Sequence, residues 1–255
     1  EFTARKAASA PEQHAEPTRI INISKIKIRT FGSIIFGAKL IFIFHSSIFF
    51  LNSPTLNFMY QFDSQVFYER RQEFLSKLNG KAAIMPSANL VQHHADCEYP
   101  FRQNSNFWYL TGFDEPDAIA LFLSQKNKGE KFILFVNPKD QISEVWQGFR
   151  WGLEGAQEVF KADKSHPIEE LESLLPYYLD GADELVFSLS KNNKIETLVL
   201  DLWSKQLENS SRSGWAPGAI RSPDLFLNEM RLVKSEYEIG RMREAAQISA
   251  DAHDF

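Results

Sequence analysis

The hydrophobic and polar positions after residue 59 alternate between helical and extended patterns. Residues 64–78 carry apolar side chains at helical spacing with Glu and Arg on the other face, and Asn79-Gly80 follows as a stop signal. We therefore expect a surface helix over 64–78. Its single buried stripe would comprise Val66, Phe67, Phe74, Leu75 and Leu78.

After residue 80, short apolar runs alternate with amphipathic helical patterns. The apolar runs predict strands at 81–87, 118–124, 131–138 and 184–190, and the polar loop with Gly129 joins the second and third of these as a hairpin. Helical spacing predicts helices at 167–180 and 193–210, the latter burying Ile195, Leu198, Leu202 and Leu207 on one face. This alternation indicates an α/β domain with a mixed β-sheet flanked by helices.

One stretch, EYPFRQNSNFWYLTGFDEP at 98–116, concentrates aromatic side chains around a glycine. Gly112 permits a turn there. Arg102, Gln103 and Asn104 are harder to bury, so we expect them to satisfy backbone groups near the turn or to face a neighbouring domain. The bulky apolar members should lie largely in the core, and these are Phe107, Trp108, Tyr109, Leu110 and Phe113.

The last segment predicts one more helix. Ser235 is followed three residues later by Glu238, which is the spacing of a capping box. Ile239, Met242 and Ala246 then form an apolar stripe that runs to the end of the sequence with no C-cap glycine. We expect the packing partner of this helix to lie beyond residue 255.

Composition excludes some functions. The formal net charge of −5 gives no reason to expect nucleic-acid binding, because a phosphate-binding surface needs clustered Lys and Arg. Cys97 is the single cysteine, so an intramolecular disulfide is excluded and a reducing compartment is favoured.

Charge is unevenly spread along the chain. Residues 1–58 hold seven Lys and Arg against three Glu, a balance of +4, so −9 falls on residues 59–255. The apolar run 31–51 is interrupted by Lys39 and His45, which disfavours a membrane span. Residues 1–58 are therefore interpreted as a basic, apolar extension.

Two origins of this extension remain open. It is either an organellar targeting segment or a non-native translated leader. The second origin is suggested by Glu1-Phe2, which the restriction site GAATTC encodes, and it would put the natural start at Met59.

Candidate chemistry in the chain is sparse. There is no Gly-x-Ser-x-Gly elbow and no phosphate-cradling glycine loop. Residues 93–98 cluster His93, His94, Asp96, Cys97 and Glu98, but neighbours in an extended segment point to opposite faces and no second cluster supplies further ligands. We expect neither a catalytic set nor a metal site in this chain.

Several ordered blocks resemble a known family. The stretch EYPFRQNSNFWYLTGFDEPDA, together with RRQEFLSKL (70–78), EVWQGFRWG (144–152) and the segment 228–253, is similar to the N-terminal domain of aminopeptidase P, the Xaa-Pro aminopeptidases of the pita-bread metallopeptidases. The resemblance implies three parts, namely the extension 1–58, an N-terminal domain over 59–234, and the first helix of a truncated catalytic domain over 235–255.

The resemblance also implies where the chemistry lies. In this family two manganese ions are held by two Asp, one His and two Glu of the catalytic domain, downstream of the position that matches Phe255. Trp146 matches a tryptophan at the active-site mouth of a neighbouring subunit, which implies a substrate-lining role in a homo-oligomer, with Arg150 and Trp151 as weaker candidates for the same rim. Ordinary loop or interface packing is the alternative for Trp146.

The implied activity is manganese-dependent hydrolysis of the N-terminal Xaa-Pro bond in peptides whose second residue is proline. This chain would then be the non-catalytic, substrate-orienting and oligomerising domain, inactive alone. The alternatives are a free-standing interaction module and a prolidase-like Xaa-Pro dipeptidase. We expect a cytoplasmic protein, or a mitochondrial or plastid one if residues 1–58 are a targeting segment.

Overall fold

The computed structural model describes residues 34–36, 39–44, 47–51, 63–95 and 97–253, and the chain divides into two units after Asn52. The described part of the first unit is an antiparallel sheet of β1 (Ile34–Phe36), β2 (Lys39–Phe44) and β3 (Ser47–Leu51). None of the described helices is long and apolar enough to cross a bilayer. The expected boundary at residues 58–59 lies outside the described residues and stays a prediction.

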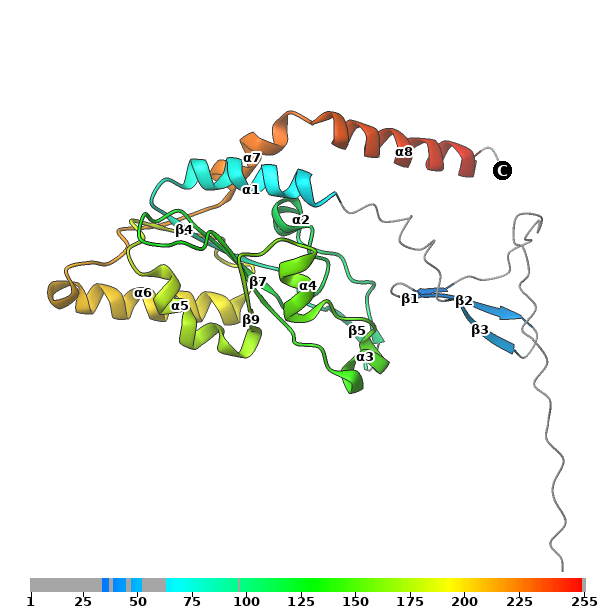
Figure 1. Ribbon diagram of the computed structural model, residues 1–255, viewed down its shortest axis with the longest axis horizontal. Coiled ribbons are helices and arrows are strands. Elements are labelled where there is room, and N and C mark those ends of the chain that lie inside the picture. The colour runs from blue at the N-terminus through cyan, green and yellow to red at the C-terminus, as the bar shows by residue number, and fades with distance from the viewer. Residues whose placement is uncertain (1–33, 37–38, 45–46, 52–62, 96, 254–255) are drawn as a thin grey trace, which may run out of the picture. The chain divides into compact units, whose positions relative to one another are not determined.

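A six-stranded mixed sheet forms the centre of the second unit (Figure 1). Strand β7 (Ile119–Leu123) runs antiparallel to both of its neighbours, β4 (Ala82–Pro86) and β8 (Phe132–Val136), whereas the other adjacent pairs are parallel. The expected hairpin is confirmed, with Ile119 opposite Phe135. In spatial order the strands are β11 (Ile220–Arg221), β10 (Leu185–Phe187), β4 (Ala82–Pro86), β7 (Ile119–Leu123), β8 (Phe132–Val136) and β9 (Lys164–Pro167).

Helices cover both faces of this sheet, as Figure 1 shows for α1 on one side and α5 and α6 on the other. Successive strand residues point to opposite faces, so Ala83 and Phe122 join one apolar cluster while Ala82 and Leu121 join the other. The first face packs against α1 (Ser64–Leu78), α2 (Ser105–Thr111), α4 (Gly152–Glu158) and α7 (Asp224–Leu232), and the second against α5 (Leu171–Leu179) and α6 (Asn193–Ser213). The expected α/β class is confirmed.

Helix α1 begins and ends where its pattern predicts. The Asp63 side chain caps it by accepting a hydrogen bond from the Gln65 N–H, and Asn79 ends it in the left-handed conformation. The expectation that its arginines lie on the exposed face is wrong for Arg71, which is buried. Its guanidinium stacks on Phe132 at 4.5 Å and donates to the Leu110 carbonyl at 3.2 Å, so α2 supplies the partner that burial requires.

Helix α6 follows its predicted face only in its first half. Ile195 and Val199 are buried, and Leu198 and Leu202 pack against the same cluster. Leu207 was expected on this face but is exposed, because no residue of α6 beyond Trp203 reaches the described apolar cluster.

The remaining described elements are short, except for the last helix. Strands β5 (Gln92–His94) and β6 (Cys97–Glu98) form a small hairpin, α3 (Gln141–Gln147) follows β8, and a 3-10 turn at Ile168–Glu170 precedes α5. Helix α8 (Glu236–His253) begins with the predicted capping box, in which the Ser235 N–H donates to the Glu238 carboxylate and the Glu238 N–H donates to the Ser235 hydroxyl. Met242 and Ala246 of its apolar stripe are exposed.

Candidate functional site

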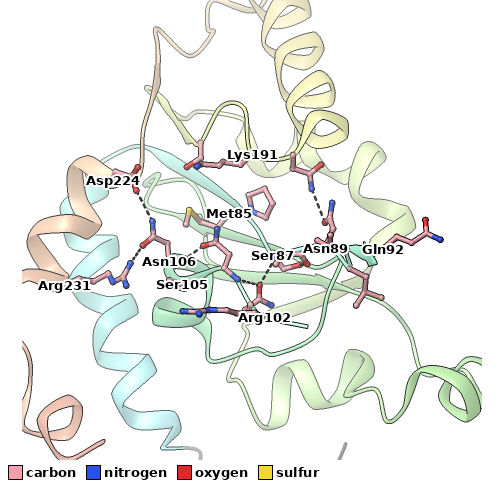
Figure 2. Close-up of a pocket in the computed structure, with 18 residues that line it drawn as sticks. Met85, Ser87, Asn89, Gln92, Arg102, Ser105, Asn106, Lys191, Asp224 and Arg231 are labelled. Carbon is pink, nitrogen blue, oxygen red and sulfur yellow. Dashed lines mark hydrogen bonds between the residues drawn. The ribbon is translucent and has the colours of Figure 1, made fainter. Parts of the chain in front are cut away.

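A cleft of about 880 Å³ opens at the carboxyl ends of the neighbouring parallel strands β4 and β10 (Figure 2). Met85 and Pro86 end β4 at this cleft, and Ser188 follows β10. The first residues of α2, the N-cap Asn192 of α6, and Asp224 and Arg231 of α7 complete the wall. Ligands of open α/β sheets bind at the carboxyl ends of parallel strands, so this cleft is the first place to look for a binding site.

The Gln103 side chain organises one wall of the cleft. Its amide oxygen accepts from the Ala88 N–H at 2.7 Å and the Asn104 N–H at 2.8 Å. Its amide nitrogen donates to the carbonyls of Phe113 at 3.2 Å and Glu115 at 2.9 Å. The expectation that Gln103 satisfies backbone groups is confirmed, and the loop after β4 is thereby held to the segment after α2.

Asn104 explains why the aromatic stretch contains a helix. Its side-chain oxygen accepts from the N–H groups of Asn106 and Phe107 and so caps α2. Gly112 ends the helix at φ +66°, as the predicted turn requires. The helix itself was not predicted, although an Asn three residues before a run of bulky apolar residues is a recognisable N-cap signal. Four of the expected core side chains are buried, namely Phe107, Tyr109, Leu110 and Phe113, and Trp108 is half-buried.

Asn106 connects two helices at the flank of the cleft. Its amide nitrogen donates to the Asp224 carboxylate at 3.0 Å, and its oxygen accepts from the Arg231 guanidinium at 2.5 Å. Both partners belong to α7, so this one side chain joins the start of α2 to α7 (Figure 2). Sequence reasoning missed this group, because its members lie more than 110 positions apart in the chain.

The cleft is electropositive. Asp224 is the one carboxylate among the described lining residues, against Arg102, Lys191 and Arg231. Arg102 and Lys191 are exposed and make no ion pair or hydrogen bond within the described part of the chain. In Figure 2 they lie on opposite sides of Met85. Arg102 was expected to satisfy backbone groups near the turn or to face a neighbouring domain, and the second of these stays a prediction. Nothing in the sequence pattern pointed to Lys191.

Trp146 does not line this cleft. It lies on α3 with 82% of its surface exposed, beside the equally uncovered Ile142 and Val145. Phe149 follows one residue past the C-cap of the helix and is also exposed. We call Ile142, Val145, Trp146 and Phe149 the α3 patch. The substrate-lining role of Trp146 stays a prediction.

Trp151 joins the block 144–152 to the aromatic stretch 98–116. Its backbone N–H donates to the Glu115 carboxylate at 2.5 Å and its indole N–H to the Asp114 carboxylate at 3.2 Å. Burial raises the pKa of Glu115 to about 7, a rise that the Trp151 hydrogen bond opposes and the neighbouring Asp114 charge reinforces. Trp151 thus packs against the core, and its expected place at the substrate rim, like that of Arg150, stays a prediction. Arg150 is held nearby, with its N–H on Glu144 at 2.9 Å and its guanidinium on the Pro138 carbonyl at 3.3 Å.

No group of three or more His, Cys, Asp and Glu side chains comes together as a metal site within the described residues. In the β5–β6 hairpin the His93 ring contacts the rings of His94 and Tyr99. The carboxylate-rich pair of metal positions that the family resemblance implies therefore does not fit the described residues of this chain.

The chain is similar to known proteins over most of its length. Residues 67–187 match the family model "Aminopeptidase P, N-terminal domain". The Xaa-Pro aminopeptidase of Haemophilus influenzae is 35% identical over 199 residues, which are 78% of this chain and 44% of that protein. The mitochondrial intermediate cleaving peptidase 55 of Arabidopsis thaliana is 29% identical over 181 residues, 71% of this chain and 34% of that protein.

A solved structure shows the same relationship in three dimensions. Zinc-substituted Escherichia coli aminopeptidase P in complex with product superposes with a TM-score of 0.70 at 33% identity, over 76% of this chain and 44% of that one. The chain thus spans less than half the length of these relatives. Residues 67–187 of the chain are therefore identified as an N-terminal domain of the aminopeptidase P family.

Proposed function

We propose that the full-length protein is an Xaa-Pro aminopeptidase that hydrolyses the N-terminal Xaa-Pro bond of peptides, and that this chain supplies a non-catalytic domain of it. The observation that carries this proposal is the 35% identity to an Xaa-Pro aminopeptidase of which the chain spans 44%. The described residues offer no metal cluster that could hydrolyse a peptide bond. Chemistry is therefore assigned to a second domain.

The metal belongs to that second domain in this proposal. The E. coli relative has been obtained in a zinc-substituted form, which supports metal dependence in the family. We assign two manganese ions, which would supply an activated water at neutral pH, to residues outside those described here. This chain's part is to position peptides and subunits around that site.

The α3 patch supports the positioning role. Ile142, Val145 and Trp146 are each at least 75% exposed on one short helix, and contiguous exposed apolar side chains mark interaction surfaces. We assign this patch to the contact between subunits of a homo-oligomer, with Trp146 lining the substrate path of the neighbouring subunit.

The proposed cellular location depends on whether residues 1–58 are a targeting segment. We place the protein in the cytoplasm, or in the mitochondrion or plastid if the basic extension is a targeting segment. The mitochondrial Arabidopsis relative supports the second location. Fusing residues 1–58 to a fluorescent protein separates the two, because a genuine targeting segment carries the fluorescence into the organelle and a non-native leader leaves it in the cytoplasm.

The proposal is tested on the parent transcript and on this chain. Sequencing past the codon for Phe255 should show an open frame that encodes the spaced Asp, Asp, His, Glu and Glu ligands. The purified 255-residue chain should release no amino acid from an Xaa-Pro-Yaa peptide with Mn²⁺. A stop codon directly after Phe255, or Mn²⁺-dependent release by the chain alone, contradicts it. The stop codon would favour a free-standing interaction module.

A further inference from the structure

We propose that the cleft at the ends of β4 and β10 binds the carboxylate of a short peptide, with Arg102 and Lys191 as its charged contacts. This goes beyond the proposed peptidase function, because the site lies on the non-catalytic domain and needs no metal. Three properties of the cleft support it, namely its charge, its unused hydrogen-bonding groups and its size.

The charge of the cleft opposes that of its surroundings. Residues 59–255 carry a balance of −9, yet the described lining holds three basic side chains and one acidic one. Arg102 and Lys191 have no acidic partner in the described part of the chain, so an incoming anion displaces no existing ion pair. A positive cleft in a negative domain concentrates anions from solution.

Some neutral side chains of the cleft are hydrogen-bonded within the protein, and others have no hydrogen bond to a described residue. Gln103 and Asn106 use both ends of their amides within the protein, so they shape the wall. The hydroxyls of Ser105 and Ser188 line the cleft without a hydrogen bond to any described residue, and they are available to peptide N–H and C=O groups. Asp224 also lines the cleft, and its carboxylate accepts a hydrogen bond from Asn106, whose amide oxygen accepts from the Arg231 guanidinium.

Size and apolar contacts favour a peptide over an inorganic ion. The cleft, about 880 Å³ in volume and open to solvent, has room for a short peptide. Met85, Leu90 and Val91 also line the cleft, and only an organic ligand gains from them. An arginine guanidinium matches a carboxylate in two parallel hydrogen bonds, which suits Arg102 to this role.

The test is a binding titration of the full 255-residue chain labelled with ¹⁵N. The probes are N-acetyl-trialanine as the free acid, the same peptide as its C-terminal amide, acetate, and inorganic phosphate. We expect the acid to shift the amide signals of Asn89, Ser105 and Ser188 and to bind roughly tenfold more tightly than the amide. Acetate and phosphate should bind more weakly than the acid peptide, because they lack the apolar contacts.

Variants identify the contacts. Arg102→Gln and Lys191→Gln should each weaken binding of the acid peptide by roughly fivefold, and the double variant should remove the preference for acid over amide. Lys205→Gln is the matched control, since Lys205 is an exposed lysine of α6 that does not line the cleft. All these side chains are exposed, and a thermal unfolding curve for each variant verifies its fold.

Several results would overturn the inference. These are equal affinity for acid and amide, unchanged affinity in the double variant, and phosphate binding as tight as that of the peptide acid. The probe has a blocked N-terminus and no proline, and the readout is binding without hydrolysis. Failure here therefore leaves the proposed peptidase function standing, and failure of that function leaves this inference standing.

Discussion

The guanidinium of Arg70 lies 3.1 Å from the carboxylate of Glu238 and so joins α1 to the first turn of α8. Arg70 also lies over the Tyr109 ring at 4.2 Å and donates to the Tyr109 carbonyl at 3.3 Å. The Tyr109 hydroxyl in turn donates to the Met230 carbonyl at the end of α7. The start of α8 is therefore held to the core by a chain of polar contacts, although its later turns are exposed.

Glu238→Ala should loosen the start of α8. The substitution removes both the ion pair to Arg70 and the acceptor of the Ser235 N–H. We expect faster amide hydrogen exchange over residues 237–242 and a loss of global stability below about 1 kcal/mol, because the pair is partly exposed. Glu244→Ala removes an exposed pair within α8 and is the control. Unchanged exchange at the start of α8 in Glu238→Ala would contradict this account.

The stability of the domain should depend more on the size of the side chain that replaces Arg71 than on the loss of the charge. Burial lowers the pKa of its guanidinium to about 10, and one of its terminal nitrogens has no hydrogen-bond partner among the described residues. Arg71→Ala leaves a cavity beside Phe132 and should lower the free energy of unfolding by about 3 kcal/mol. Arg71→Met fills the space without a buried charge and should lower it by about 1 kcal/mol or less. Urea unfolding of both variants measures the two losses. Equal losses of unfolding free energy would show that the charge of Arg71 matters more than its size.

Glu115 should make the domain less stable as pH rises. Its folded-state pKa is raised from 4.5 to about 7, so its stabilising contribution is complete below about pH 4.5 and is lost as pH rises through 7. The loss is at most about 3 kcal/mol. Glu115→Gln keeps an acceptor for the Trp151 N–H and does not ionise, so its unfolding free energy should exceed that of the parent at pH 8 and match it at pH 4.

Urea unfolding across this pH range provides the check. The control is Glu172→Gln, since Glu172 is exposed on α5. If Glu115→Gln and the unmodified chain lose stability in parallel between pH 5 and 8, the burial of Glu115 is not the cause.

Two glycine substitutions should act in opposite directions. Gly112 ends α2 at φ +66°, where an alanine is strained, so Gly112→Ala should destabilise the domain by about 1 kcal/mol. Gly240 lies inside α8 with open space around the position of a β-carbon, so Gly240→Ala should raise the helical content of α8. Thermal unfolding and far-ultraviolet circular dichroism report the two effects, and a stabilised Gly112→Ala would refute the role given to the turn.

Trp146→Ala should affect catalysis of the parent enzyme without affecting the fold of this domain. The side chain is 82% exposed, so its removal leaves no cavity in the core. We expect kcat/KM for Xaa-Pro peptides to fall by roughly tenfold if the indole lines the substrate path. Tyr177→Ala, which removes another exposed aromatic side chain, is the control. Unchanged kcat/KM together with a smaller oligomer would assign Trp146 to the interface alone.

The elements with strong local signals could be predicted from the sequence. Helix 64–78 has an N-cap acid, an apolar stripe and an Asn-Gly stop, and its bounds agree with the prediction. Strands β4, β7, β8 and β10 were recognised because their apolar runs are short and bounded by turn residues, whereas the edge strands β9 and β11 carry no such runs and were not predicted. The buried Arg71 escaped prediction, because its burial depends on the carbonyl of Leu110, 39 residues away.

The candidate site could be predicted only in part. Gln103 and Asn104 were singled out, since polar side chains beside a buried aromatic stretch need partners. The cleft itself assembles the ends of β4 and β10 with α7, and no local pattern shows that residues near 86, 188 and 231 meet. That information lies in the strand order, which places β10 next to β4.

We propose above that this chain is the non-catalytic part of an Xaa-Pro aminopeptidase. The most direct measurement compares the full-length parent with the 255-residue chain on Ala-Pro-Phe and Ala-Ala-Phe, each with Mn²⁺ and with EDTA. The account predicts that the parent with Mn²⁺ releases alanine from Ala-Pro-Phe only, and that the chain alone releases none. Equal cleavage of both peptides by the parent, or no cleavage of Ala-Pro-Phe, would contradict it.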